Sequence, residues 1–511
     1  MEKPAHKPFV KKWWIKTIEA AHPDILPAVI KFFIKHWDKI LVGILILVYS
    51  IVFSTLSIGR HDAFASGFDL GNMDSTVWNT LQGRIFMLSG DGGMASRFSI
   101  HADLILALLS PLYIFWNDVR MLLITQSALL AVGAIPVYLL AQKVLKSKQL
   151  SIAMVVLYLL NPGMQWTNMY DFHPISLAIP FLLFAFYFAY TKSWKWYALF
   201  AILAILTKEQ VSLTISLMGI FILIFHKERK VGLISFVGGI VWTFGIMFVV
   251  MPLFSPEGRH WAWSWFQFSS TSSGGSLITV TNKILERVVF SPDLSPYYIG
   301  LLKPFTYLPL LGLPWLIFAL PDLAINVLSS HGQMRSFVLH YDSGITPWLT
   351  VASIFGLSYT RWILVRMKLV SRYAKHITTL VVAVVMLFAL RFNYHYSPLP
   401  TTPSCWCFMY EPTKEDRAFE KLLQSIPQSA SVTASPEIRP HTTHRAQAFT
   451  LPDATSSADF IAIIDQNRMV GNYDPKDFEL RLMETLNAEK KYDLVQQIGH
   501  FYLYQRRGPM R

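Results

Sequence analysis

The stretch that decides the fold reads SIGRHDAFASGFDLGNMDSTVWNTLQGR over residues 57–84 and SRFSIHADLILALLSPLYIFWND over residues 96–118. It lies between hydrophobic segments and carries a series of aspartates: Asp62, Asp69, Asp74, Asp91 and Asp103. Aromatic residues lie among them at spacings typical of a segment that buries one face: Phe64, Phe68, Trp78 and Phe86. We therefore expect this acidic stretch to fold into a site rather than to be an unstructured connector.

The composition of the whole chain is that of a membrane protein. Of 511 residues, 53% are hydrophobic and only 15% are charged, whereas soluble domains carry about 25% charged residues. The net charge of +13 would also suit a nucleic-acid-binding protein. The lysines lie mainly beside apolar segments, however, where positive charge sets orientation in a membrane. We therefore predict a protein of the cytoplasmic membrane that binds no nucleic acid.

The apolar segments predict about nine complete membrane spans, since a span needs about 20 mostly apolar residues. The first span, Ile40–Ile58, follows three lysines, which predicts that residues 1–39 are cytoplasmic and loop 59–118 is external. The other spans are 121–140, 152–166, 175–190, 196–207, 211–225, 231–253, 345–365 and 377–390. Segment 297–328 is broken by prolines and raises the total to eleven if it forms two short arms.

Two regions outside the spans differ in composition. Loop 254–296 is polar and includes the Ser/Gly-rich run 269–276, which predicts a flexible external loop. Residues 391–511 are richer in polar residues and predict a small external α/β domain. Its expected helices are 415–426 and 476–492, and its expected strands are 430–435, 446–452, 459–465 and a pair within 492–507. The fold class is thus a polytopic α-helical membrane protein, residues 40–390, with a soluble C-terminal domain.

The chain has two cysteines, Cys405 and Cys407, with one residue between them. This spacing is poor for a mutual disulfide, which needs Cα atoms roughly 4.4–6.8 Å apart and converging side chains. We predict two free thiols.

Polar residues collect in four loops that the alternation of spans places on one membrane face. They are Asp69 and Asp74, Asp171 and His173, Lys208 and Glu209, and His340 with Asp342. Ionisable groups at membrane depth are costly and usually functional. We therefore expect these loops to open into one shared cavity.

The residue types in this predicted cavity favour one kind of chemistry. A carboxylate that is partly removed from water can act as a general base. A lysine and a histidine or arginine can hold a phosphate group. Together they suit transfer from a phosphate-activated donor to an acceptor hydroxyl. No cluster has a convincing metal-ligand spacing, so we predict no cofactor and find no support for a divalent metal.

Several motifs resemble a known family. They are FDLGNMDSTVWNTLQGR (68–84), HADLILALLSPLYIF (101–115), YDFHP (170–174), TKEQ (207–210), HYDSGITP (340–347) and IPQSASVTASPEIRPH (426–441). They resemble the membrane-protein family called domain of unknown function 2079, from about residue 40 to residue 465. That family in turn resembles the GT-C superfamily of integral-membrane glycosyltransferases, which use polyprenyl-phosphate sugars.

This resemblance implies roles for particular residues. Asp69 holds the position of the catalytic acid in the first external loop, and Asp171 matches a second acid in the next external loop. Thr207-Lys208 matches a pair whose lysine lies near the donor phosphate. Many members have Asp-Glu where this chain has Asp69-Leu70, so the resemblance leaves metal use open and keeps Asp74 as a rival base.

Structural roles are the alternative at each position. Asp69 and Asp171 can cap helices, and Lys208 can snorkel at a helix end. The further candidates are Arg259 and Arg335 for the donor phosphate, and His101 and Tyr341 elsewhere in the site. Three tryptophans, Trp261, Trp263 and Trp265, are interpreted as membrane-interface anchors rather than as sugar-stacking platforms.

The resemblance and the cavity chemistry together predict a glycosyltransferase at the outer face of the cytoplasmic membrane. Its partners would be membrane lipid, a polyprenyl-phosphate sugar donor, and a glycan, lipid or protein acceptor. Two alternatives stay open: a transporter or flippase for a lipid-linked or anionic solute, and a non-catalytic scaffold. The clustering of charge on one face and the lack of a sequence repeat disfavour the transporter.

Overall fold

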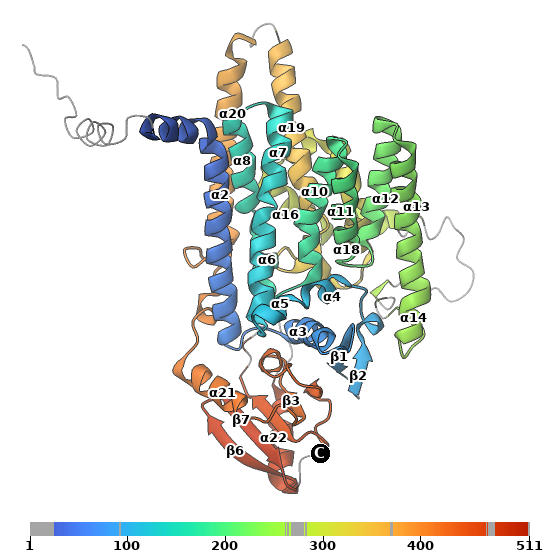
Figure 1. Cartoon of the computed structure of the whole chain (residues 1–511), viewed down its shortest axis with the longest axis vertical. Helices are drawn as coiled ribbons and strands as arrows, with labels where there is room; N and C mark the ends of the chain where they lie inside the picture. Colours follow the sequence, from blue (N-terminus) through green and yellow to red (C-terminus); the bar gives the residue numbers. More distant parts are fainter. Residues whose placement is uncertain are drawn as a thin grey trace, which may run out of the picture.

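The computed structural model shows a mostly helical molecule, in which helices stand side by side and a small sheet unit lies at one end (Figure 1). It describes residues 25–90, 93–260, 262, 265–266, 281, 284–367, 371–466, 468 and 476–508. Asp91, Trp261, Trp263 and the Ser/Gly-rich run 269–276 lie outside the described residues.

Five helices in the described part of the chain are long and apolar enough to cross a membrane. They are α2 (Ile25–Asp62), α6 with α7 (Arg120–Val132, Ala134–Leu145), α13 with η4 and α14 (Arg229–Gly245, Ile246–Val250, Met251–Phe254), α19 (Thr346–Arg366) and α20 (Ala374–Tyr396). Shorter apolar helices occupy the other predicted spans: α8 (Lys148–Leu159), η2 with α10 (Pro174–Leu177, Ala178–Tyr190), α11 (Trp194–Ile205) and α12 with η3 (Val211–Phe221, Ile222–His226). The predicted polytopic helical fold is confirmed.

One predicted span is shorter than its apolar run. The sequence predicted a continuous helix over 152–166, but α8 ends at Leu159 and α9 (Pro162–Tyr170) begins three residues later. Asn161 caps α9 by accepting a hydrogen bond from the backbone N–H of Met164, and Pro162 occupies the first helical turn. A proline inside a helix removes a backbone donor and clashes with the preceding turn, so the chain restarts here.

The basic turn between α7 and α8 contacts both α2 and α19 at one end of the bundle. Lys148, the first residue of α8, forms an ion pair of 2.9 Å with Asp38 near the start of α2. Arg361, in the last turns of α19, donates to the carbonyl oxygen of Leu145 at 2.8 Å. The acidic stretch and the sheet unit lie at the opposite end (Figure 1). Which of these ends faces the cytoplasm stays a prediction.

The proline-rich segment is broken into short helices, as predicted. They are α16 (Leu294–Leu302), η8 (Lys303–Phe305), α17 (Leu308–Leu311), η9 (Leu313–Ala319) and α18 (Leu320–Leu328). Part of this segment is buried in protein: a Cβ built at Gly312 would overlap the backbone of Ala352 in α19. Irregular backbone is tolerated at membrane depth under that condition.

The acidic stretch after α2 is folded, as its aromatic spacing predicted. It forms α3 (Phe68–Leu81), the antiparallel hairpin β1–β2 (Met87–Gly90, Gly93–Ser96), η1 (Arg97–Ser99) and the short helices α4 (Ile105–Leu109) and α5 (Leu112–Phe115). The face of α3 that carries Leu70, Val77 and Trp78 is buried in the main hydrophobic core. The aromatic and aliphatic residues of this stretch therefore anchor it to the helical bundle.

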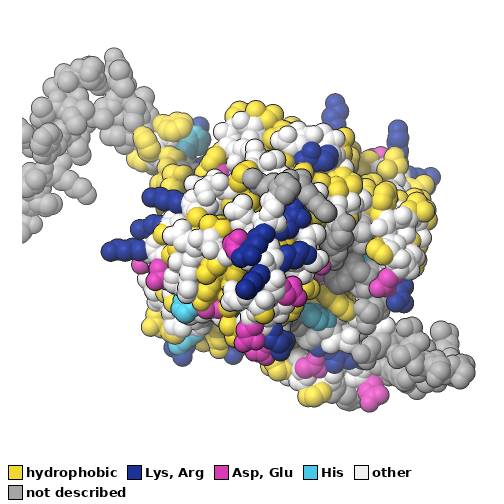
Figure 2. Space-filling model, turned by 90° about the horizontal axis from the view of Figure 1, so that it is seen from below, with side chains coloured by type: hydrophobic (Ala, Val, Ile, Leu, Met, Phe, Trp, Pro, Cys, Tyr) yellow, Lys and Arg dark blue, Asp and Glu magenta, His cyan; other side chains and the backbone are white. Residues whose placement is uncertain are grey.

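The sheet unit has five strands in the order β4-β3-β5-β7-β6. The strands are β3 (Val432–Ala434), β4 (Ala448–Thr450), β5 (Phe460–Ile464), β6 (Tyr492–Ile498) and β7 (Phe501–Arg506), and the helices are α21 (Lys414–Gln424) and α22 (Asp477–Glu489). All of them lie within the predicted ranges except α21, which begins one residue earlier, at Lys414. Thr413 and Asp416 form a capping box that fixes the start of α21. Seen from this end (Figure 2), charged side chains are spread over the middle of the face, as expected for a surface in water.

The acidic stretch and the sheet unit share a core. Phe64 is fully buried and packs against Phe419 and Phe501 of the sheet unit, with ring centroids 5.7 and 4.9 Å away. The ring of His441 stacks on His61 and on Phe64, at 4.0 Å from each. Because these contacts join residues more than 350 positions apart, the sheet unit is fixed against the end of α2.

The prediction of two free thiols is wrong. Cys405 and Cys407 form a disulfide, with Cα atoms 5.1 Å apart. The chain turns at Trp406, whose backbone is not helical (φ −91°, ψ 41°). This turn brings the two Cα atoms within bonding range.

Close packing of α12 against α13 gives a first testable prediction. A Cβ at Gly239 would overlap the carbonyl oxygen of Ser212 and the side chain of Ser216, whereas a Cβ at Gly238 meets nothing within 4 Å in the described part of the chain. We expect Gly239→Val to lower the free energy of unfolding by about 1–3 kcal/mol relative to Gly238→Val, because overpacking forces the helices apart. Thermal unfolding of both variants in one detergent measures the difference, and equal melting temperatures would contradict it.

Candidate functional site

A cavity of about 680 Å³ lies beside α3 at the end of the bundle that carries the sheet unit. It is lined by α3, the segment after β2, the α9–η2 and α11–α12 loops, the last turns of α13 and the loop before α19. The predicted site residues in its wall are Asp69, His101, His173, Lys208, Glu209, His340 and Tyr341. The structure therefore brings together side chains from all four of the predicted loops.

Asp69 lies in the first turn of α3, and its side chain is 34% exposed. Its Oδ2 lies 3.6 Å from Nε2 of His173, which is longer than a hydrogen bond. Burial raises the pKa of Asp69, but the facing His173 ring and the charge of Arg97 outweigh this effect and hold the pKa below its usual value. Asp69 is thus an ionised, accessible carboxylate at neutral pH.

Two buried histidines stack face to face in the cavity wall. The rings of His173 and His340 lie 3.8 Å apart with an interplanar angle of 16°. Burial lowers the pKa of His340, and His173 and Lys208 lower it further, so this ring is neutral. Within the described residues, neither His173 Nε2 nor His340 Nδ1 has a hydrogen-bond partner. Buried polar atoms are rarely left in this state, so these two nitrogens are unusual features of the cavity wall.

Lys208 follows the last turn of α11 and is half-buried. The preceding Thr207 donates from its hydroxyl to the carbonyl oxygen of Ala204 at 2.6 Å, which fixes the end of the helix. Among the residues that the structure describes, none forms an ion pair with the Lys208 ammonium. A cation in a cavity wall without an anionic partner is suited to hold a phosphate.

Glu209 lies next to Lys208 and is surrounded by two histidines. Its Oε1 lies 3.0 Å from Nδ1 of His101 and 3.4 Å from Nε2 of His260. Its Oε2 accepts the backbone N–H of Ala102 at 3.2 Å. Burial raises the pKa of Glu209, but His101 and His260 outweigh it and hold the pKa well below its usual value.

Asp171 does not line this cavity, although the sequence predicted it as a second site acid. Its Oδ1 forms a 2.9 Å ion pair with Arg60, and its Oδ2 accepts the backbone N–H of Gly67 at 2.8 Å. Arg60 also donates to the carbonyl oxygens of Met169 and Tyr170, each at 2.6 Å. Both carboxylate oxygens of Asp171 are therefore used in structural contacts, which connect the end of α9 to the residue before α3.

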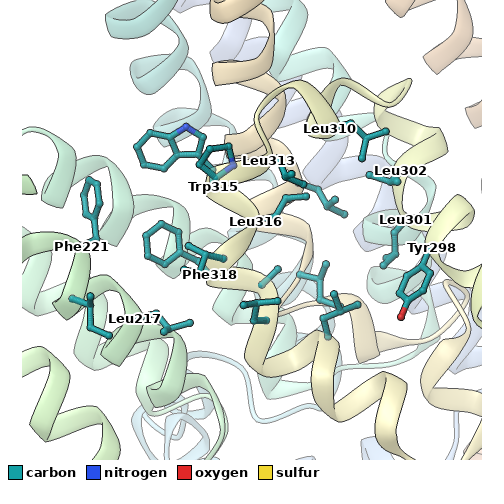
Figure 3. A pocket seen from close by; sticks show the side chains of 18 of the residues that line it. Leu217, Phe221, Tyr298, Leu301, Leu302, Leu310, Leu313, Trp315, Leu316 and Phe318 are labelled. Atoms are coloured by element: carbon teal, nitrogen blue, oxygen red, sulfur yellow. The ribbon is translucent and has the colours of Figure 1, made fainter. Parts of the chain in front are cut away.

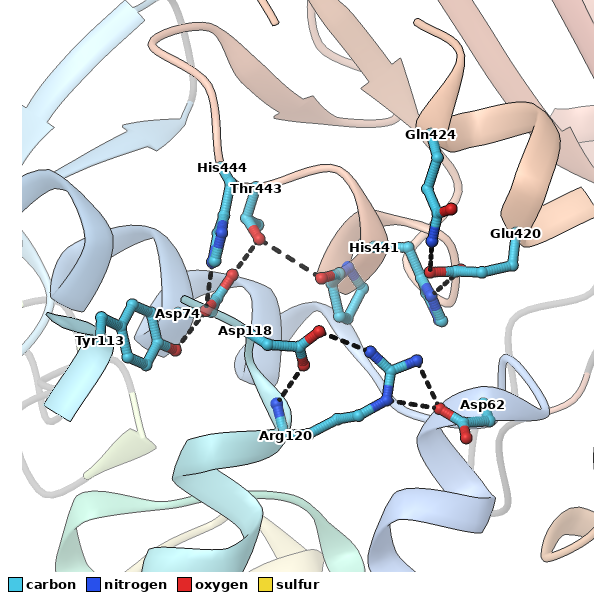
Figure 4. A network of polar contacts seen from close by, with 11 residues as sticks. Asp62, Asp74, Tyr113, Asp118, Arg120, Glu420, Gln424, His441, Thr443 and His444 are labelled. Atoms are coloured by element: carbon cyan, nitrogen blue, oxygen red, sulfur yellow. Dashed lines mark hydrogen bonds and ion pairs between the residues drawn. The ribbon is translucent and has the colours of Figure 1, made fainter. Parts of the chain in front are cut away.

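Asp74, the rival base, points away from the cavity and is completely buried. Figure 4 shows that it is enclosed by the hydroxyl groups of Tyr113 and Thr443 and by Nε2 of His444, the last at 3.0 Å. Burial lowers the pKa of His444, but the Asp74 carboxylate outweighs it and raises the pKa above its usual value. Asp74 thus holds the sheet unit onto α3.

The two candidate arginines also lie outside the cavity wall. Arg259 is 64% exposed and pairs with Glu257 at 3.0 Å. Arg335 pairs with Asp293 at 2.7 Å and donates to the carbonyl oxygens of Asn326 and Ser329. Both guanidinium groups have protein partners in this arrangement.

The sequence did not predict His260 or the place of Trp265 in the cavity wall. His260 reaches Glu209 across 51 positions, and no local spacing marks it as a partner. Trp265 lines the cavity, where its ring stacks on His331 at 4.4 Å and 10°. In the run RHWAWSWF the tryptophans alternate with the small residues Ala262 and Ser264, and this pattern alone does not distinguish a membrane anchor from a cavity wall.

Comparison with solved structures gives distant matches. The oligosaccharyltransferase of Archaeoglobus fulgidus in the apo form matches 84% of this chain and 70% of its own, with 12% identity and a TM-score of 0.45. ArnT from Cupriavidus metallidurans, bound to undecaprenyl phosphate, matches 90% of this chain and 97% of its own, with 11% identity and a TM-score of 0.48. No curated protein matches the sequence.

One family model matches most of the chain. The model described as predicted membrane protein, DUF2079, matches residues 60–506, which include the acidic stretch, the cavity loops and the sheet unit. The chain therefore belongs to the DUF2079 family of membrane proteins.

Proposed function

We propose that this protein transfers a sugar from a polyprenyl-phosphate donor to an acceptor hydroxyl at the extracytoplasmic face of the membrane. The observation that carries the proposal is the make-up of the cavity. One space is lined by an accessible carboxylate (Asp69), a lysine with no ion pair in the described part of the chain (Lys208) and two buried histidines. Each histidine has a ring nitrogen without a hydrogen-bond partner among the described residues. This set of groups suits a reaction in which a base removes the proton of an acceptor hydroxyl and a phosphate is the leaving group.

Each group has a defined step in this reaction. Asp69 takes the proton of the acceptor hydroxyl, whose oxygen bonds to the anomeric carbon of the sugar. The bond between that carbon and the phosphate oxygen breaks, and polyprenyl phosphate leaves with the electron pair. Lys208 neutralises the phosphate, and the N–H of the neutral His340 ring is available to donate to it.

A second cavity supports a donor with an isoprenoid chain. It has a volume of about 920 Å³ and is lined almost entirely by apolar side chains, among them Leu217, Phe221 and Phe318 (Figure 3). It adjoins the polar cavity along α12, where Leu213 lines the polar cavity and Leu217 lines the apolar one. One helical turn, about 5–6 Å, separates these positions. A phosphate at Lys208 would thus have an apolar channel beside it.

Two observations, on charge and on sulfur chemistry, support the proposed side of the membrane. The cavity lies at the end of the bundle opposite the basic turn that carries Lys148, and basic loops face the cytoplasm. The disulfide of Cys405 and Cys407 follows α20, and Trp406 between the two cysteines lies against Arg60 in the last turn of α2, 5.4 Å from its guanidinium group. Disulfides persist in oxidising compartments. Both observations support an extracytoplasmic cavity.

Lys208 gives the direct test of donor binding. We expect Lys208→Met to raise the donor KM by roughly 10- to 150-fold, since a hydrogen bond to a charged group contributes about 1.5–3 kcal/mol. Lys195→Met is the matched control, because Lys195 is exposed at the start of α11, the helix that Lys208 follows.

The assay incubates the purified protein with a panel of polyprenyl-phosphate sugars and follows sugar transfer and donor hydrolysis. An unchanged KM in Lys208→Met would remove this lysine from the donor site. Absence of turnover with every donor, together with solute uptake in vesicles, would favour a transporter instead.

A further inference from the structure

The cavity wall contains a second cluster whose chemistry differs from that of the proposed transfer. His101, Glu209 and His260 each offer one ligand atom, and these atoms lie within 4.8 Å of one another. Glu209 and His260 are buried, and His101 is half-buried. The three residues come from the segment after β2, the α11–α12 loop and the chain after α14.

We infer that His101, Glu209 and His260 bind one divalent transition-metal ion, with Zn²⁺ as the best fit. Two imidazoles and one carboxylate are a ligand set of zinc sites that keep a fourth position open. Ligands about 2.0–2.1 Å from a tetrahedral ion lie roughly 3.3 Å apart. The two distances to Oε1 of Glu209, 3.0 and 3.4 Å, bracket that value. The ligand atoms of His101 and His260 lie within 4.8 Å of each other, so metal binding can require these two rings to move closer together.

The surroundings hold the carboxylate in place. Oε2 of Glu209 accepts the N–H of Ala102, so backbone from the same segment as His101 orients the group. Such partners of metal ligands fix their orientation. Lys208 and Arg97 bring positive charge to the same cavity. This charge repels a metal ion that binds alone, but it favours a metal ion that binds together with an anion contacted by the same lysine or arginine.

One hydrogen bond must change when the metal binds. The backbone N–H of Ala262 donates to Nδ1 of His260 at 3.1 Å, which leaves the ring proton on Nε2 facing Glu209. A metal on Nε2 requires the proton on Nδ1 instead. The backbone at Ala262 therefore moves away from the ring, and its amide hydrogen should exchange faster in the metal-bound protein.

Because all three ligands line the cavity, a fourth ligand can come from a molecule bound there, and an oxygen of the donor phosphate would complete the shell. This role rests on the proposed glycosyl transfer, whereas the binding of the metal does not. Metal content and turnover are therefore measured separately.

The test uses the full chain without a histidine tag, stripped by a chelator and titrated with Zn²⁺ alone. We expect one Zn²⁺ per chain by elemental mass spectrometry and a tetrahedral absorption spectrum with Co²⁺. His260→Gln and His101→Gln should each weaken binding by more than about 100-fold, the upper end for loss of an outer-shell partner. His331→Gln is the control, since His331 lines the same cavity outside the cluster, and melting temperatures check that each variant is folded.

Two outcomes would overturn the inference. One is a wild-type protein that binds Zn²⁺ no more tightly than a folded His101→Gln/His260→Gln double variant. The other is an unchanged amide exchange rate at Ala262 with and without Zn²⁺. Stoichiometric Zn²⁺ without sugar transfer would defeat the proposed function and leave the metal site standing. Transfer that survives the chelator in a metal-free protein would remove the metal from the reaction, while the proposed function and the metal binding would both stand.

Discussion

Asp69→Asn is expected to reduce sugar transfer by about 10²–10⁴-fold, the usual contribution of a general base, with no change in folding. The side chain is 34% exposed and lies 3.6 Å from His173. His173 and Arg97 favour its charge, but solvent screens much of this effect, so loss of the charge should lower stability only slightly. Exposed substitutions of this kind change stability by at most about 0.5 kcal/mol. Transfer kinetics and thermal unfolding of the same preparation measure both parts.

Asp74→Asn on the same helix is the matched control. Asp74 is fully buried against Tyr113, Thr443 and His444, so its loss should weaken the attachment of the sheet unit and lower the melting temperature. If Asp69→Asn kept full turnover while a stably folded Asp74→Asn lost it, the base would be Asp74 and the assignment would be reversed.

The pH dependence of turnover gives a second test of Asp69 as the general base. The pKa of Asp69 is held below its usual value, so the carboxylate stays ionised throughout the neutral range. Protonation of Asp69 removes the base only below about pH 4, the ordinary range of a carboxyl. We expect no loss of turnover attributable to this group between pH 8 and pH 5. A titration near pH 6 that disappears in Asp69→Asn would contradict the assignment.

Asp171→Ala is expected to lower the free energy of unfolding by about 3–5 kcal/mol, the cost of breaking a buried ion pair. The Asp171 and Arg60 side chains are only 4% and 3% exposed. Without Asp171, a buried guanidinium loses its counter-ion and the N–H of Gly67 loses its acceptor. Chemical denaturation of the purified variant in detergent provides the measurement.

Two further variants sharpen this prediction. Arg60→Met combined with Asp171→Leu should recover part of the loss, because replacing both charges removes the uncompensated one. Glu257→Gln is the exposed control: its pair with Arg259 is 64% exposed on both sides, and such pairs contribute about 0–1 kcal/mol. If Asp171→Ala had normal stability but no turnover, Asp171 would have a role in the reaction rather than in stability.

Some residues of the site could be predicted from the sequence and others could not, and the difference has a physical reason. Lys208 and His340 could be placed in a shared cavity because alternating spans deliver alternate loops to one face. The partners of Asp171 and Asp74, Arg60 and His444, lie 111 and 370 positions away, and nothing local in the sequence reveals them. His260 was missed for the same reason, and so was the metal cluster that it completes with His101 and Glu209.

The sequence alone determined the helical membrane architecture, the folded acidic stretch and the strands near the C-terminus. Those features follow from the length and period of apolar runs, which act on neighbouring residues. Helix geometry also separates Asp69 from Asp74 by roughly 140° around α3, so the sequence already required that they face different surroundings. Only the tertiary structure decided which surroundings each one meets, since the packing of distant segments around α3 leaves Asp69 in the cavity and seals Asp74 beneath the sheet unit.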